Sequence, residues 1–148
     1  MLKIRSEQIR PFEPDAKAAF VNRVMNYLRE NHGDALVRLP KGQNSVAELP
    51  ETILRNLVEN GIARGESYGL TWKSSLISFV VLMFIVAPNF DLDEKVAKVL
   101  TDENIPADKR VRVITEQMTD EDWEKVAEKY DEKAWQKVVA AVAGGENK

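Results

Sequence analysis

The stretch that decides the fold is IARGESYGLTWKSSLISFVVLMFIVAPNFD, residues 62–91. The pair Tyr68-Gly69 is typical of a helix end, and Thr71 is a good N-cap for the helix that follows. This next segment is apolar around nearly its whole circumference, so other elements have to surround it. The stretch therefore predicts a buried central helix, Trp72–Ala87.

Helix signals recur on both sides of this stretch, whereas strand signals are weak. Proline suits the first turn of a helix, and Asp and Thr suit its N-cap. We expect further helices that start near Pro14, Pro50, Asp91, Pro106 and Thr119. The sequence thus predicts an all-α fold, a single compact bundle of about five to six helices around the central one.

The domain is expected to span residues 1–143, with residues 144–148 as a disordered polar tail. Residues 34–49 are interpreted as an exposed loop. At Asp91, Glu94 follows three residues later, which resembles a capping box. The last helix is expected to run without a break from Thr119 to Ala143.

Two glycines, Gly61 and Gly65, lie four residues apart on the helix that Pro50 starts. Each costs a helix roughly 1 kcal/mol against alanine. Close packing against a neighbouring helix would compensate for this cost. A frayed or broken last turn is the alternative that the sequence leaves open.

Composition excludes several classes of protein. The 148 residues are 44% hydrophobic and 30% charged, as in an ordinary folded domain. A net charge of -3 argues against nucleic-acid binding, which needs a concentrated basic face. The apolar run Leu76–Ala87 is too short for a bilayer, which needs about twenty residues. The start, MLKIRSEQIRPFE, has no secretory-signal core, so we expect a cytoplasmic protein without membrane insertion.

No catalytic, cofactor-binding or metal-binding residues are expected. The chain has no cysteine and one histidine, His32, at a predicted helix C-terminus where a cation is favoured. Its acidic groups, Asp91 to Glu94 and Asp120 to Glu124, fall at predicted helix N-termini, where carboxylates are favoured as capping residues. No phosphate loop and no serine nucleophile elbow are present.

A protein partner is the remaining expectation. From Asp91 onward the chain has ten Lys/Arg and fifteen Asp/Glu, so its second half is acidic. Tryptophan is enriched both in cores and at binding hot spots, so either Trp123 or Trp135 could face outward. The candidate partner-binding residues are Trp72, Trp123, Glu124, Glu128, Asp131, Glu132 and Trp135.

Residues 1–115 resemble a family of short helical proteins. The resemblance rests on the opening MLKIRSEQIRPFE, on IARGESYGL, on FVVLMFIVAPNFD and on TDENIPADKRV. Its motifs stand here as Gly61-Ile62, Tyr68-Gly69, Leu82-Met83-Phe84, Pro88-Asn89-Phe90-Asp91 and Leu100-Thr101-Asp102. This family is associated with gene clusters for type VI secretion spikes, PAAR-tipped proteins and polymorphic toxins in Gram-negative bacteria. The chain departs from it by a longer loop at Pro40–Ser45 and by the acidic helix Asp120–Ala143.

The resemblance implies a genomic context rather than a chemical reaction, and three hypotheses follow. In the first, the protein is a non-enzymatic adaptor or chaperone for a secreted toxin or spike component. In the second, it is the cognate immunity protein, which binds and neutralises a toxin. In the third, it is a small enzyme or toxin that uses helix-start carboxylates such as Asp91 and Asp93.

Overall fold

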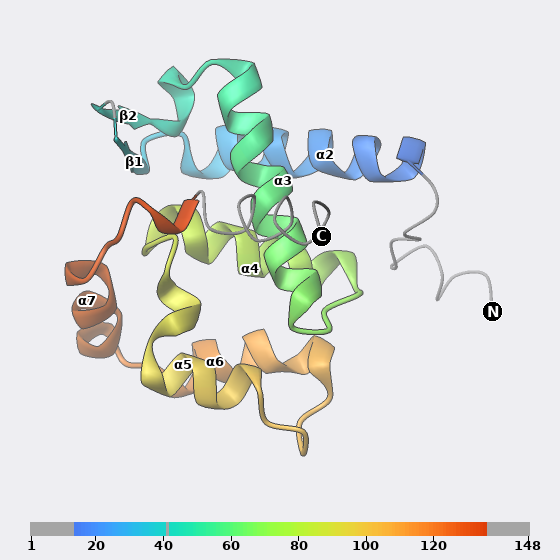
Figure 1. Ribbon diagram of the computed structural model, residues 1–148, viewed down its shortest axis with the longest axis vertical. Helices are drawn as coiled ribbons and strands as arrows, with labels where there is room; N and C mark the ends of the chain where they lie inside the picture. The colour runs from blue at the N-terminus through green and yellow to red at the C-terminus, as the bar shows by residue number, and fades with distance from the viewer. Residues whose placement is uncertain (1–13, 41, 136–148) are drawn as a thin grey trace, which may run out of the picture.

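The chain forms a helical bundle with one small hairpin in a computed structural model that describes residues 14–40 and 42–135 (Figure 1). The helices are α2 (Pro14–His32), α3 (Glu51–Ser67), α4 (Lys73–Ile85), α5 (Glu94–Leu100), α6 (Arg110–Gln117) and α7 (Asp120–Glu128). The strands are β1 (Leu36–Leu39) and β2 (Gly42–Ser45), and single 3-10 turns lie at Val46–Glu48 (η1), Phe90–Leu92 (η2) and Ala107–Lys109 (η3). The predicted all-α bundle is confirmed.

Helix α4 is the central element, as the sequence predicts. Phe79 and Met83 have no exposed surface, and Leu82 is buried as well. The helix packs against α2, α3 and α6 and against β1. Figure 1 shows α2 on one side of α4, with α5 and α6 on the opposite side. Among the described residues, no helix combines the length and apolar character that crossing a membrane requires.

The start of α4 differs from the expectation that Thr71 caps it. The N-cap position is Trp72, whose side chain caps nothing. Asp108, at the turn before α6, instead accepts hydrogen bonds from the Thr71 and Trp72 amides at 2.9 and 2.8 Å. The Thr71 hydroxyl also donates to this carboxylate. A residue distant in sequence therefore supplies the negative charge that the positive end of α4 favours.

Helices α3 and α4 approach closely at the two glycines. A Cβ atom at Gly65 would lie 2.9 Å from a Leu76 methyl carbon, and one at Gly61 would lie 3.1 Å from a methyl carbon of Val80. Both glycines are buried inside α3. The close-packing interpretation is confirmed, and the alternative of a frayed last turn is wrong.

The expected loop at residues 34–49 contains a β-hairpin. β1 and β2 pair antiparallel, with Leu36 opposite Ser45 and Leu39 opposite Gly42. Val37 on β1 is fully buried and attaches the hairpin to the core. Each strand has only four residues. An alternating pattern this short is hard to distinguish from a loop.

The expected continuous helix from Thr119 to Ala143 is also wrong. Thr119 does cap α7, but the helix ends at Glu128, and helix resumes only at Ala134. Between them the chain turns, because the amides of Lys129 and Tyr130 donate to carbonyls only three residues back. Residues 136–143 of that prediction, and the tail at 144–148, lie outside the described residues.

Candidate interaction surface

One face of α7 carries exposed carboxylates at helical spacing. Asp120, Glu121, Glu124 and Glu128, here called the acidic ridge, are all exposed. Residues four apart lie one above the other on a helix, so Asp120, Glu124 and Glu128 form a row. The ion pairs between described residues include none of these four side chains.

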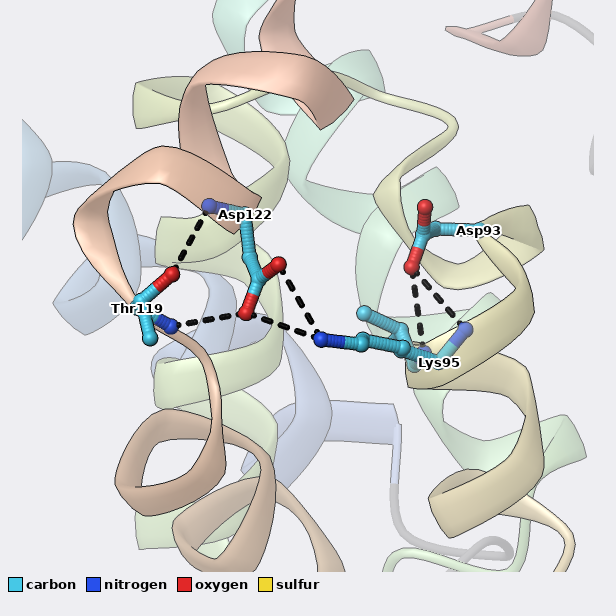
Figure 2. Close-up of polar contacts among 5 residues, drawn as sticks. Asp93, Lys95, Thr119 and Asp122 are labelled. Carbon is cyan, nitrogen blue, oxygen red and sulfur yellow. Dashed lines mark hydrogen bonds and ion pairs between the residues drawn. The ribbon is translucent and has the colours of Figure 1, made fainter.

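The opposite face of α7 holds the helix against the bundle. Val126 is buried, and Trp123 is half-buried against the core. Thr119 and Asp122 form a capping box, in which the Thr119 amide donates to the Asp122 carboxylate at 3.0 Å. The Lys95 ammonium lies 3.1 Å from both oxygens of this carboxylate, a contact that Figure 2 draws as dashed lines. α7 is therefore fixed to α5 at its N-terminal end.

The Asp122 carboxylate belongs to this support and not to the acidic ridge. The hydrogen bond from the Thr119 backbone, followed by the bond from Lys95, lowers its pKa below the ordinary value of 3.8. Both donors favour the charged form of the acid. Asp93, also drawn in Figure 2, accepts from the amides of Lys95 and Val96 and caps α5.

A second support fixes the other end of α7. The Asn89 side-chain amide donates to the carbonyl of Lys129 at 2.9 Å, and the Asn89 oxygen accepts from the amide of Asp131 at 3.0 Å. Residues 89 and 95 thus contact opposite ends of α7, and the chain between them runs alongside the helix. Leu92 lies in this segment with 53% of its surface exposed.

Asp91 does not cap a helix, which corrects the sequence-based expectation. It is completely buried in η2, and Asp93 takes the capping role. One Asp91 oxygen, Oδ2, accepts from Arg64 Nε and from the Tyr68 hydroxyl, each at 2.7 Å. The other oxygen, Oδ1, has no hydrogen-bond partner. Burial and this hydrogen bond raise the pKa of Tyr68 far above its ordinary value of 10.0.

The same arginine links α3 to the segment that follows α7. Arg64 Nη1 donates to the carbonyl of Ala134 at 3.2 Å. On the same helix, Asn60 donates to the carbonyl of Trp135 at 3.1 Å. Together with Asn89, these side chains form what we call the polar tether. The tether joins α3 and the segment after α4 to the residues that follow α7.

Trp135 is a core residue, so it is withdrawn from the candidate partner-binding residues. Its side chain is 1% exposed, and its ring centroid lies 4.8 Å from that of Phe84. The indole donates to the Tyr130 hydroxyl at 3.0 Å, and the Arg38 guanidinium lies 4.1 Å from the centre of the Tyr130 ring. These contacts join the hairpin to the segment after α7.

The other candidate residues fall into three places. Glu124 and Glu128 lie on the acidic ridge. Asp131 and Glu132 are half-buried and line a shallow hollow of about 260 Å³ with Arg38, Tyr130 and Lys133. Trp72 is 38% exposed and lies apart from both, in a groove between α4 and α6. The structure therefore does not bring all seven candidates into one site.

The buried pair Arg64–Asp91 is the feature that sequence reasoning missed. Its members are 27 residues apart, on α3 and η2. Arg64 lies in the last turn of a helix and Asp91 lies before the next one, and charged residues at such positions are usually exposed. Within the part of the chain that the structure describes, no three His, Asp or Glu side chains are placed to hold a metal ion. Comparisons of the chain with protein-family models, curated proteins and solved structures found no match.

Proposed function

We propose that the protein is a non-enzymatic adaptor or chaperone that binds a secreted type VI toxin or spike component in the cytoplasm. The acidic ridge of α7 would contact a basic surface of that partner. The observation that carries this proposal is the row of exposed carboxylates without ion pairs to described residues. The type VI context rests on the resemblance of residues 1–115 alone.

The charge arrangement on α7 has a cost that a partner would remove. Like charges four residues apart destabilise a helix by roughly 0.2–0.5 kcal/mol per pair. Asp120 with Glu124 and Glu124 with Glu128 are two such pairs on a nine-residue helix. A basic partner surface would convert this repulsion into attraction, and complementary charge would also accelerate association.

A charge-matched pair of variants tests the binding surface. The first is Glu121→Gln with Glu124→Gln and Glu128→Gln. The control is Glu30→Gln with Glu59→Gln and Glu103→Gln, which changes net charge equally at exposed positions on other elements. Binding is measured against the toxin or spike protein encoded beside this gene, by surface plasmon resonance at two salt concentrations.

We expect the ridge variant to associate on the order of tenfold more slowly at low salt, with dissociation changed less. The control should associate as the parent does. Equal association rates for the two variants would refute a role for the acidic ridge. Removing the chain after Met118 would be a poorer test, because it would delete the buried Trp135 and the partners of Arg64 and Asn60.

Cellular assays separate the adaptor from the immunity protein. An adaptor is required for the toxin to be secreted, and its deletion should leave the toxin inside the producing cell. An immunity protein instead restores growth when co-expressed with the active toxin. We expect loss of secretion in the deletion strain and in the ridge variant. Growth rescue with unaffected secretion would replace the adaptor hypothesis with the immunity hypothesis.

A further inference from the structure

The central helix has one stripe that its neighbours leave open. Ser74, Ser78, Val81 and Ile85 recur at intervals of four, three and four residues, so they share one face of α4. Both serines are exposed, Val81 is half-buried and Ile85 is 46% exposed. The other apolar residues of α4 are buried or partly buried against the core. Among the described helices α4 is the most apolar, so an open face on it requires an explanation.

At its N-terminal end this stripe forms one wall of a groove. The opposite wall comes from η3 and α6, which contribute Lys109, Arg112 and Thr115. The groove has a volume of about 380 Å³, and Trp72 lines it with 38% of its surface exposed. Volumes of roughly 300–1,000 Å³ are typical of ligand sites in proteins. We call this the α4–α6 groove.

The walls of the groove are fixed to each other by hydrogen bonds. Asp108 accepts from the Thr71 and Trp72 amides, and the Ser75 hydroxyl donates to the Asp108 carbonyl at 2.8 Å. These bonds join the first turn of α4 directly to the start of α6. The groove is therefore formed before any partner arrives, which reduces the entropy that binding would cost.

The charges that remain available at the groove are positive. Asp108 is occupied by three donors at the N-terminus of α4. Lys109 is exposed and makes no ion pair with the described residues. Arg112 is 81% exposed, with only an exposed intrahelical contact to Glu116 at 3.3 Å. A chain of net charge -3 thus presents a cationic rim beside an exposed tryptophan.

We propose that the α4–α6 groove binds an acidic segment of a protein partner. One large apolar side chain of that segment would lie against Trp72, over Ser74 and Ser78, and flanking carboxylates would pair with Lys109 and Arg112. The indole offers a broad apolar surface, and the guanidinium can take a carboxylate with two parallel hydrogen bonds. This inference goes beyond the proposed function, because the acidic ridge suits a basic surface and this groove suits the opposite charge.

The probe is a blocked hexapeptide with Leu-Phe at its centre and two glutamates on each side. A second peptide carries lysines in place of the glutamates, and a third carries Ala-Ala in place of Leu-Phe. Binding to the full-length protein is followed by ¹⁵N-resolved NMR, with the Trp72 indole resonance assigned through Trp72→Phe. We expect the glutamate peptide to shift the Trp72 indole and the Ser74 and Ser78 amides, and to bind at least about tenfold more tightly than the other two peptides.

Two groove variants and one control make the test specific. Lys109→Glu with Arg112→Glu reverses the charge of the rim, and Ser78→Trp places a large side chain in the groove at an exposed position. Each should raise the Kd for the glutamate peptide at least about tenfold. Arg23→Glu with Lys98→Glu changes the net charge equally at exposed sites elsewhere and should leave the Kd unchanged.

Three outcomes would overturn the inference. The first is equal affinity for the glutamate and lysine peptides, and the second is a set of shifts that avoids Trp72. The third is a short single-stranded DNA that binds the groove more tightly than the glutamate peptide, which would assign the cationic rim to nucleic acid. None of these results would bear on the acidic ridge, whose variants are measured separately.

Discussion

The α3–α4 pair and the segment around α7 differ in the contacts that hold them. Between α3 and α4, Gly61 and Gly65 let two helices approach until their apolar side chains interlock. α7 and the residues after it bury Val126 and Trp135, and they are also held by directional hydrogen bonds to Lys95, Asn89, Arg64 and Asn60. Apolar packing depends on a periodic pattern of residues, whereas each hydrogen bond depends on one donor and one acceptor lying within bonding distance.

The largest loss of stability should come from the apolar side. Phe79 has no exposed surface, and its ring centroid lies 5.8 Å from that of Tyr68 and 5.0 Å from that of Phe90. Phe79→Ala should lower the free energy of unfolding by roughly 3–5 kcal/mol through lost burial and the cavity left behind. Urea denaturation measures this. A loss below about 1 kcal/mol would contradict the placement of Phe79 in the core.

On the polar side, the largest effect should follow the loss of Arg64. Arg64→Met leaves the buried Asp91 carboxylate without its cation, which we expect to cost about 3 kcal/mol. Arg55→Met, on the exposed side of the same helix, is the control and should cost at most about 1 kcal/mol. Adding Asp91→Leu to Arg64→Met should recover part of the loss, because no buried charge then remains unpaired.

The same variant distinguishes the two regions. Arg64 also holds the Ala134 carbonyl, so Arg64→Met should accelerate amide exchange in residues 130–135 more than in α4. Equal acceleration in both regions would mean that the tether and the apolar core unfold as one unit.

This difference explains what could be predicted from the sequence. The buried central helix, the close approach at Gly61 and Gly65, and the Thr119 cap each follow from a local or periodic pattern. The Arg64–Asp91 pair, the capture of Lys129 by Asn89 and the use of Asp108 at α4 join residues 27, 40 and 36 or 37 positions apart. The sequence predicts Asp91 as a helix N-cap because Asp is preferred at that position, but Asp93 takes the role. The break after Glu128 was missed because the apolar stripe continues past it.

Tyr68 should give a smaller effect that depends on pH. Tyr68→Phe removes a hydrogen bond to a carboxylate, which should cost roughly 1.5–3 kcal/mol at neutral pH. Because the pKa of Tyr68 is raised in the folded protein, its contribution is fully present below its ordinary value of 10.0 and is lost as pH rises above it. We therefore expect the parent to lose stability more steeply than Tyr68→Phe above pH 10.0, by denaturant titration. Parallel pH profiles would contradict the buried hydrogen bond.

The smallest effect on stability concerns Asp122, which supports the helix that carries the acidic ridge, and we expect it at low pH. The pKa of Asp122 is lowered in the folded protein, so its contribution is present above the ordinary value of 3.8 and is lost as pH falls below it. Asp122→Asn should remove that part of the acid sensitivity, and Asp120→Asn, two residues earlier on the exposed ridge, should not. Thermal unfolding followed by circular dichroism between about pH 5 and pH 2 measures both slopes across the range in which paired carboxylates titrate. If the two variants keep the parent's slope, the contact between Lys95 and Asp122 does not stabilise α7 in solution, and the ridge would need another support.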